Sequence, residues 1–225
     1  MALILLLDTS TSLLSVALSR DGKAVAQKVC KEPRQQASLT APLVKEILDS
    51  QGLKVQDCDA ICVSKGPGSY TGLRVGVSTA KGLAFGAGKP LLSVGTLDML
   101  ANQAPAGQWK YIVPMIDARR MEVYTAVFSP DGRQFTPVEA RIIGPESFAD
   151  ELAQGPVLFI GDGALKCKDA LTSANAHFVE DWPLAASMAE AAEKAYNEKR
   201  FEDLAYFEPF YLKDFVATVS RKQLW

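Results

Sequence analysis

The chain opens with a pattern of apolar and polar positions that is typical of a β-meander. Residues 2–7 form a continuous apolar run, as expected of a central strand buried on both faces. Residues 14–18 alternate between apolar and polar side chains, and Asp21-Gly22 is a strong hairpin signal before a third strand-like segment at residues 24–30. We therefore predict three strands, the last two joined by a tight turn.

Helical spacing appears twice after this meander. Apolar residues recur every three or four positions between residues 38 and 50, where Pro42 is compatible with a helix only near its first turn. Residues 59–64 predict a strand, residues 69–86 a second helix, and residues 91–94 a short final strand. The predicted order is β-β-β-α-β-α.

The same order returns further along the chain. An apolar strand ends in Asp117 as the first strand ends in Asp8, and the alternating segment "MEVYTAVF" precedes a second Asp-Gly turn at residues 131–132. A helix near Pro145–Leu152, the strand "PVLFIGDG" and another helix complete the unit. Two tandem β-β-β-α-β-α units predict an α/β protein with mixed sheets. This is the duplicated layout of the actin-like (ASKHA, sugar-kinase-like) fold.

The repeat also predicts the division of the chain into two subdomains. We place the first at residues 1–103 and the second at residues 104–205, with the crossing point near Asn102–Gln108. The C-terminal residues 206–225 are expected to return and complete the first subdomain. In the actin-like superfamily a nucleotide lies in the cleft between the two halves.

Composition narrows the choice of partners and compartment. With 225 residues, 22% charged and 48% hydrophobic, and a net charge of −2, the chain has no overall field that would attract nucleic acid or an anionic membrane. The apolar start is short and lacks a basic flank, so a buried strand fits it better than a signal peptide. The four cysteines form no Cys-x-x-Cys pair and are interpreted as reduced thiols. We expect a cytoplasmic protein with no membrane contact.

The glycine-rich stretch at residues 65–90 lies in front of and within the second predicted helix, which raises the question of phosphate binding. Its spacings match neither Gly-x-x-x-x-Gly-Lys-Ser/Thr nor Gly-x-Gly-x-x-Gly. Small residues instead recur every four positions, which on a helix forms two grooves. The two grooves are Gly72, Gly76 and Ala80, and Ser78, Gly82 and Gly86.

Interior glycines destabilise a helix by about 1 kcal/mol each relative to alanine, so close packing must compensate. One groove has to lie against the chain's own sheet, and the other is interpreted as a partner surface. On this interpretation Val77→Glu or Gly76→Leu breaks association and leaves the fold intact. The predicted interface comprises Leu39, Leu43, Ile47, Leu73, Arg74, Gly76, Val77, Ala80 and Lys81.

Four segments taken together resemble the bacterial TsaB (YeaZ) family. They are "LLLDTSTSLLSVAL" near the start, the helix "GPGSYTGLRVGVSTAKGLAFG", the strand region "IDARRMEVYTAVF" and "EPFYL" near the end. The resemblance therefore spans the chain. Its most specific motif consists of Gly66, Pro67, Gly68, Ser69, Tyr70, Thr71 and Gly72.

This resemblance implies an actin-like fold and a role in placing threonylcarbamoyl on the tRNA adenosine beside the anticodon. The family member is then a non-catalytic subunit that binds and activates the paralogue TsaD, with the ATPase TsaE as a further partner. Its first two helices would form a bundle with the matching helices of TsaD or, when the protein is alone, of a second copy. Contact with tRNA is expected only through the partner.

The residues provide little for catalysis by this chain alone. The paralogue's His-x-x-x-His metal pair aligns here with Gln36 and Thr40, and the only histidine is His177. No metal site is predicted. We expect that this chain alone requires no cofactor. Binding of ATP or ADP in the complex stays an open alternative.

Two enzymatic alternatives remain open at this point. Asp8, Thr9, Ser10 and Asp117 occupy the places of a nucleotide site, which we interpret as vestigial because hydroxyl side chains replace a glycine-bearing phosphate turn. Hydroxyls can still hydrogen-bond a phosphate, so weak nucleotide binding or an ATP-dependent kinase stays an alternative. A peptidase-like enzyme would have to use His177, and no Gly-x-Ser-x-Gly elbow accompanies it.

Overall fold

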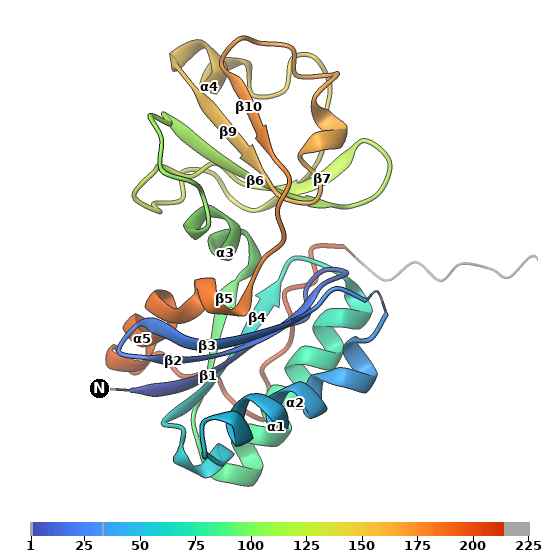
Figure 1. Cartoon of the computed structure of the whole chain (residues 1–225). Helices are drawn as coiled ribbons and strands as arrows, with labels where there is room; N and C mark the ends of the chain where they lie inside the picture. Colours follow the sequence, from blue (N-terminus) through green and yellow to red (C-terminus); the bar gives the residue numbers. More distant parts are fainter. Residues whose placement is uncertain (1, 33, 214–225) are drawn as a thin grey trace, which may run out of the picture.

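The computed structural model describes residues 2–32 and 34–213, which form two lobes, each built on one five-stranded sheet (Figure 1). In the first sheet, β1 pairs antiparallel with β2 and parallel with β4, in the order β3-β2-β1-β4-β5. The strands are β1 (Leu3–Asp8), β2 (Leu14–Arg20), β3 (Lys23–Cys30), β4 (Ala60–Gly66) and β5 (Leu91–Gly95).

The second sheet repeats this arrangement strand by strand. Its order is β10-β9-β6-β7-β8, in which β6 pairs antiparallel with β7 and parallel with β9. Strands β6 and β9 thus take the places of β1 and β4, which confirms the predicted duplication. The strands are β6 (Tyr111–Asp117), β7 (Glu122–Thr125), β8 (Glu139–Ile142), β9 (Val157–Ile160) and β10 (Ala176–Val179).

Helices α1 (Gln36–Ser50) and α2 (Tyr70–Ala87) cover one face of the first sheet, and the 3-10 turn η1 (Val55–Asp57) connects α1 to β4. Their apolar faces bury Val44, Ile47 and Val77 against the sheet. Helix α1 starts at Gln36, so Pro42 lies in its second turn rather than its first, and it is accommodated on the exposed side.

The helices of the second half are shorter than the repeat predicts. Helix α4 (Ala149–Gln154) takes the place of α1, and only the 3-10 turn η2 (Leu165–Cys167) stands where α2 stands in the first half. The helix predicted after the strand "PVLFIGDG" is therefore present only as this 3-10 turn. Residues 161–175 contain two glycines and "TSAN", and they lack an apolar stripe long enough for a helix.

The two halves exchange their last helices. Helix α3 (Thr96–Asn102) follows β5 but places Leu97 and Leu100 in the core of the second sheet. The turn η3 (Ala185–Met188) and helix α5 (Ala189–Asn197) follow β10 but pack their small side chains on the first sheet. Figure 1 shows α3 between the lobes and α5 on the face of the lower sheet opposite α1 and α2. Residues 185–197 thus belong to the core of the first half. The sequence interpretation had included them in the second subdomain, residues 104–205.

The end of the described chain runs along the first half. Glu202 pairs with Leu91 of β5, Phe207 packs beside α2, and the Phe210 N–H donates to the carbonyl of Lys65 at 2.7 Å. Residues 206–213 therefore run along the first half, and the rest of the segment that the sequence interpretation assigned to this half, residues 214–225, lies outside the described residues.

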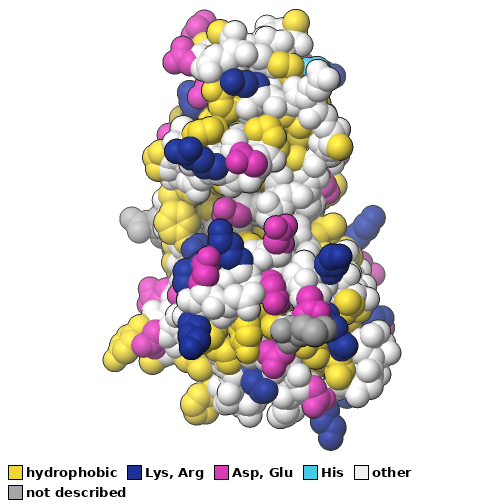
Figure 2. Space-filling model, turned by 90° about the vertical axis from the view of Figure 1, so that its left-hand side faces the viewer, with side chains coloured by type: hydrophobic (Ala, Val, Ile, Leu, Met, Phe, Trp, Pro, Cys, Tyr) yellow, Lys and Arg dark blue, Asp and Glu magenta, His cyan; other side chains and the backbone are white. Residues whose placement is uncertain are grey.

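On the face shown in Figure 2, basic and acidic side chains are interspersed, in keeping with the small net charge. None of the helices within the described ranges is both long and apolar enough to cross a bilayer.

Candidate functional site: the cleft and helix α2

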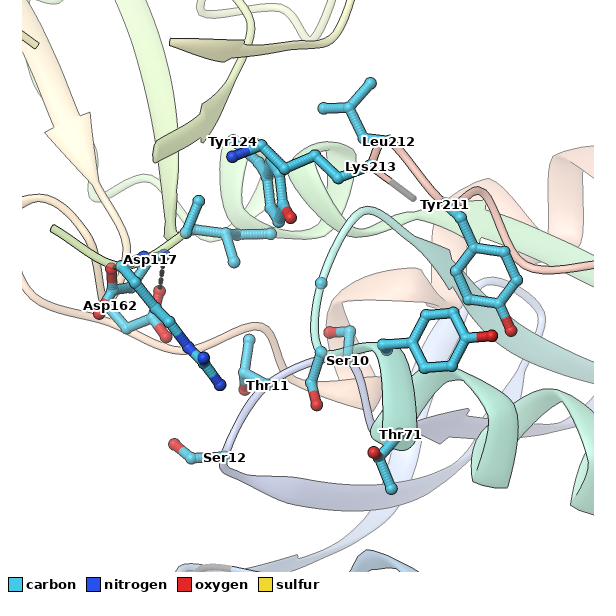
Figure 3. A pocket seen from close by; sticks show the side chains of 16 residues that line it. Ser10, Thr11, Ser12, Thr71, Asp117, Tyr124, Asp162, Tyr211, Leu212 and Lys213 are labelled. Atoms are coloured by element: carbon cyan, nitrogen blue, oxygen red, sulfur yellow. Dashed lines mark hydrogen bonds between the residues drawn. The ribbon is translucent and has the colours of Figure 1, made fainter. Parts of the chain in front are cut away.

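A pocket of about 610 Å³ lies between the two halves, at the carboxyl ends of β1 and β6 (Figure 3). This is where an actin-like fold places its ligand, and the pocket takes side chains from both halves and from the C-terminal segment. Its lining comprises Ser10, Thr11, Ser12, Gly68, Ser69, Tyr70, Thr71, Ile116, Asp117, Ala118, Arg119, Tyr124, Asp162, Tyr211, Leu212 and Lys213.

The turn after β1 is held by the glycine helix rather than left open for a phosphate. The Thr9 hydroxyl donates to the carbonyl of Gly72 at 2.7 Å, and the Ser69 N–H donates to the carbonyl of Ser10 at 2.6 Å. Both Thr9 and Ser10 are fully buried. The polar groups that the sequence offered to a nucleotide are thus partly used inside the first half.

Three glycines, Gly68, Gly72 and Gly76, lie where the helix and the loop before it come closest to this turn. A Cβ atom on Gly72 would lie 2.1 Å from the Thr9 carbonyl oxygen, and one on Gly76 would lie 2.2 Å from the Thr9 hydroxyl. A Cβ on Gly68 would lie 2.2 Å from the Ser10 carbonyl oxygen. No side chain fits at such distances, so the first groove of α2 serves packing within the chain.

This packing corrects part of the predicted partner interface. Leu73, Val77 and Ala80 are at most 4% exposed, and Gly76 is buried beside Thr9. Ile47 is also buried, while the remaining α1 positions, Leu39 and Leu43, are half-buried against the same core. A partner cannot reach Leu73, Gly76, Val77, Ala80 or Ile47, because these residues face the sheet of their own subunit.

The second groove of α2 points to solvent. A Cβ atom at Gly82 or Gly86 would meet nothing within 4 Å, and Phe85 between them is 81% exposed. Arg74 and Ser78 lie on the same side and are exposed. We call these five residues, Arg74, Ser78, Gly82, Phe85 and Gly86, the outward face of α2.

Lys81, predicted as an interface residue, has a different role. Its ammonium donates to the carbonyls of Phe207 at 3.0 Å and Ala205 at 3.2 Å. It therefore fastens the C-terminal segment to the flank of α2, beside the outward face.

Residues 66–72, the family motif, connect the end of β4, the start of α2 and the C-terminal segment. Ser69 caps the helix by accepting a hydrogen bond from the Gly72 N–H at 3.3 Å. Gly66 has φ of 108°, and a Cβ there would lie 2.8 Å from the Phe210 carbonyl oxygen. The Tyr70 ring lies 4.6 Å from that of Tyr211. The motif thus places the C-terminal segment against the cleft.

Asp8 is fully buried at the end of β1. Its Oδ1 accepts a hydrogen bond from the Ser10 N–H at 3.1 Å. Burial raises the pKa of this carboxyl to about 6, although the neighbouring Ser64 and Ser10 hydroxyls partly offset the effect. The cleft side of the first half therefore contains a carboxyl that is costly to ionise.

Asp117 and Asp162 occupy the equivalent edge of the second sheet (Figure 3). Asp162 Oδ1 accepts a hydrogen bond from the Asp117 N–H at 2.9 Å, and the Lys166 ammonium pairs with Asp117 Oδ1. Burial, with a contribution from the Asp117 charge, raises the pKa of Asp162 to about 6. Asp162 was missed by sequence reasoning, although its place directly after a buried strand, in Gly161-Asp162-Gly163, is the signal that could have found it.

The positions aligned with a histidine pair are used for packing. The Gln36 amide donates to the carbonyls of Thr11 at 2.9 Å and Ser12 at 3.2 Å, and the Thr40 hydroxyl donates to the Gln36 carbonyl. His177 is exposed on β10, beside the Trp109 ring, while Asp8 is buried in the other half. Within residues 2–32 and 34–213, no cluster of three or more His, Cys, Asp or Glu side chains is arranged for a metal ion.

Asp8→Asn is expected to stabilise the protein at neutral pH. The pKa of Asp8 is about 6 in the folded chain against 3.8 ordinarily, so the folded state binds the proton more tightly. The protonated Asp8 carboxyl therefore contributes its full share to the free energy of unfolding below about pH 4. This contribution, roughly 3 kcal/mol, is lost as pH rises through 6. Urea unfolding should therefore show a gain of about 1–3 kcal/mol for Asp8→Asn at pH 7.5 and little gain at pH 4.

The exposed Asp169→Asn serves as the matched control for that comparison. Equal effects of Asp8→Asn at the two pH values, or a loss at pH 7.5, would contradict the assignment.

Comparisons with known proteins identify the family. Residues 32–220 match the family model described as TsaD, tRNA N6-adenosine threonylcarbamoyltransferase. The chain is 32% identical over 228 residues to the tRNA threonylcarbamoyladenosine biosynthesis protein TsaB of Escherichia coli, covering 95% of this chain and 96% of that one. The solved structure of YeaZ from Pseudomonas aeruginosa is 29% identical with a TM-score of 0.83, covering 94% of this chain and 100% of that one.

A more distant structure confirms the actin-like fold. Component A of (R)-2-hydroxyglutaryl-CoA dehydratase from Acidaminococcus fermentans is 12% identical with a TM-score of 0.51, covering 89% of this chain and 100% of that one. At this identity the likeness concerns the fold alone. The E. coli and P. aeruginosa relatives, by contrast, are 32% and 29% identical over nearly the whole chain, and so this protein belongs to the TsaB (YeaZ) family of tRNA threonylcarbamoyladenosine biosynthesis proteins, with a TsaD-like domain.

Proposed function

We propose that this protein is a non-catalytic subunit of the bacterial tRNA threonylcarbamoyladenosine (t6A) machinery, and that it binds and activates the transferase paralogue TsaD. Membership of the TsaB family supports the pathway, and the match to a TsaD model supports a partner of the same fold. The observation that carries the proposal is the division of α2. One small-residue groove is filled by Thr9 and the other, with Phe85, is left uncovered by residues 2–32 and 34–213.

The outward face of α2 suits another helix. Glycines at positions 82 and 86 allow close approach of a backbone, and the exposed Phe85 provides apolar area that would be removed from water on binding. The proposed complex is a helical bundle between α1 and α2 of this chain and the matching helices of TsaD. When the protein is alone, the same face would pair with a second copy. TsaE joins the complex, and tRNA is reached through the partner.

The cleft supports the non-catalytic assignment. Thr9 and Ser10 are engaged by α2, and Gln36 and Thr40 stand where the paralogue aligns its histidine pair. We therefore propose that this chain alone requires no metal or nucleotide, and that any ATP or ADP binds in the complex. The proposed setting is the cytoplasm, without a membrane partner.

The alternative is an ATP-dependent kinase or peptidase-like enzyme of the same superfamily. The observation in its favour is the open pocket with Asp117 and Asp162 at its rim. Tight binding of magnesium-ATP to the isolated chain, measured by calorimetry, would favour the kinase. Cleavage of TsaD that is lost on replacing His177 would favour the peptidase.

Reconstitution tests the proposal. The purified chain alone should modify no tRNA, whereas its addition to TsaD, TsaE and the enzyme that makes threonylcarbamoyl-adenylate should yield t6A. The readout is t6A in digested tRNA by mass spectrometry. An unchanged yield when this chain is omitted would overturn the proposal.

A further inference from the structure

Two chain crossings connect the halves, and they lie side by side next to α3 (Figure 1). The first runs from β5 through α3 to Gln103, and the second runs from the end of β10 to η3 through Asp181, Trp182 and Leu184. Any change in the width of the cleft has to alter the backbone of these two crossings. Contacts between them therefore bear directly on how the halves move.

The side chain of Gln103 joins the crossings with three hydrogen bonds. Its Nε2 donates to Asp181 Oδ2 and to the carbonyl of Trp182, both at 2.9 Å. Its Oε1 accepts from the Leu184 N–H at 2.8 Å. The amide thus pairs with a carbonyl and an N–H of the second crossing, as a neighbouring strand would.

The second crossing is also fastened to the first sheet. The Ala185 N–H donates to the buried Ser15 hydroxyl at 2.8 Å, and the Ala186 N–H donates to Gln27 Oε1 at 3.1 Å. Residues 181–186 are consequently fixed at several consecutive positions. The only polar groups that tie them to the first crossing, within the described part of the chain, belong to Gln103.

A different contact spans the cleft at the pocket itself. The Lys213 ammonium, at the end of the segment anchored by Phe210 and Tyr211, pairs with the Glu122 carboxylate of β7. The side chains of Lys213 and Glu122 are 42% and 21% exposed, so salt screens this pair. The hydrogen bonds of Gln103 carry less charge and depend less on salt.

We infer that Gln103 is a clamp that sets the angle between the two halves, and that the Lys213–Glu122 pair is an auxiliary, salt-sensitive latch. Gln103 is a positioning residue, which acts on the cleft through the backbone of the second crossing. The inference goes beyond the proposed function, because it concerns the free chain and does not require a partner.

The test uses Gln103→Glu, which keeps the shape but replaces the donor by a carboxylate facing Asp181 and the Trp182 carbonyl. Spin labels on Ala37→Cys in α1 and Glu139→Cys in β8, in a Cys30→Ser background, report the distance between the halves of the full chain, with the labelled chain diluted into excess unlabelled chain so that only distances within one subunit are read. Both positions are exposed, and the other cysteines are buried. Gln103→Met, which removes all three hydrogen bonds without adding charge, is a second variant in case the first does not fold.

We expect one narrow distance distribution for the otherwise unmodified chain, at low and high salt. Gln103→Glu and Gln103→Met should broaden it, and 1 M salt should broaden it further in these variants, because the Debye length falls to about 3 Å and the Lys213–Glu122 pair is then screened. Lys213→Met alone should leave it narrow. Exchange of the Leu184 amide should rise about 3- to 10-fold in the Gln103 variants, while that of Ala185, held by Ser15, should not.

An unchanged distance distribution together with faster exchange at Leu184 would overturn the inference, because Gln103 would then have only a local role. Broadening by Lys213→Met alone would also overturn it, since the latch and not the clamp would set the angle.

Discussion

Replacing Gly76 by leucine is expected to destabilise the fold strongly rather than to detach a partner. A Cβ atom at this position would lie 2.2 Å from the Thr9 hydroxyl, which is itself bonded to the Gly72 carbonyl. The Thr9 hydroxyl can turn aside only by giving up its hydrogen bond to Gly72, and the backbones are held because Thr9 follows a central strand and Gly76 lies in the middle of α2. Overpacking of this kind costs about 3 kcal/mol or more, a large part of a typical domain's stability.

Urea unfolding of the purified chain measures this cost, and Gly82→Ala is its matched control on the same helix. A Cβ at Gly82 meets nothing within 4 Å, so alanine should stabilise the helix by about 0.5–1 kcal/mol. If Gly76→Leu retained wild-type stability, the first groove would not be packed as described. The sequence-based expectation that Gly76→Leu or Val77→Glu leaves the fold intact is corrected by the burial of both positions.

Gly82→Leu is expected to give the opposite result, a stable subunit that no longer engages TsaD. Leucine favours the helix relative to glycine, and the space beside Gly82 is open in the free chain. In a complex that packs a second helix against the outward face, the leucine side chain would block close approach. A clash of about 1–3 kcal/mol corresponds to roughly 5- to 150-fold weaker binding.

Calorimetric titration with TsaD checks the affinity, and the yield of t6A in the reconstituted system checks the consequence. Gly144→Leu is the control, since a Cβ there also meets nothing within 4 Å, but in the other half. Undiminished binding by Gly82→Leu would remove α2 from the interface.

Much of the fold could be predicted from the pattern of apolar residues. The first three strands and the hairpin at Asp21-Gly22 are local features, and the repeat of strand ends at Asp8 and Asp117 indicated that the second half repeats the elements of the first. The exchange of α3 and α5 between the halves could not be predicted in this way. An amphipathic helix shows that it has an apolar face, but not which of two sheets will cover it.

The site illustrates the same limit. The spacing of Gly72, Gly76 and Ala80 correctly indicated close packing, but spacing cannot tell the backbone of a partner from that of Thr9 and Ser10. The two grooves have similar composition, and only the position of the turn after β1 distinguishes them. Tyr124, Tyr211 and Asp162 reach the pocket from segments far apart in the sequence, so the pattern of each segment alone did not show that their side chains meet there.

The central claim is that the outward face of α2 is the surface that TsaD covers. Ser78→Cys in a Cys30→Ser background places one accessible thiol on the outward face of α2, because the three remaining cysteines are buried. Its labelling rate reports whether a partner covers this face. We predict that saturating TsaD slows thiol labelling of Ser78→Cys by at least about tenfold, whereas labelling of Gly144→Cys is unaffected. An unchanged labelling rate at residue 78 in a complex that still forms would contradict the account.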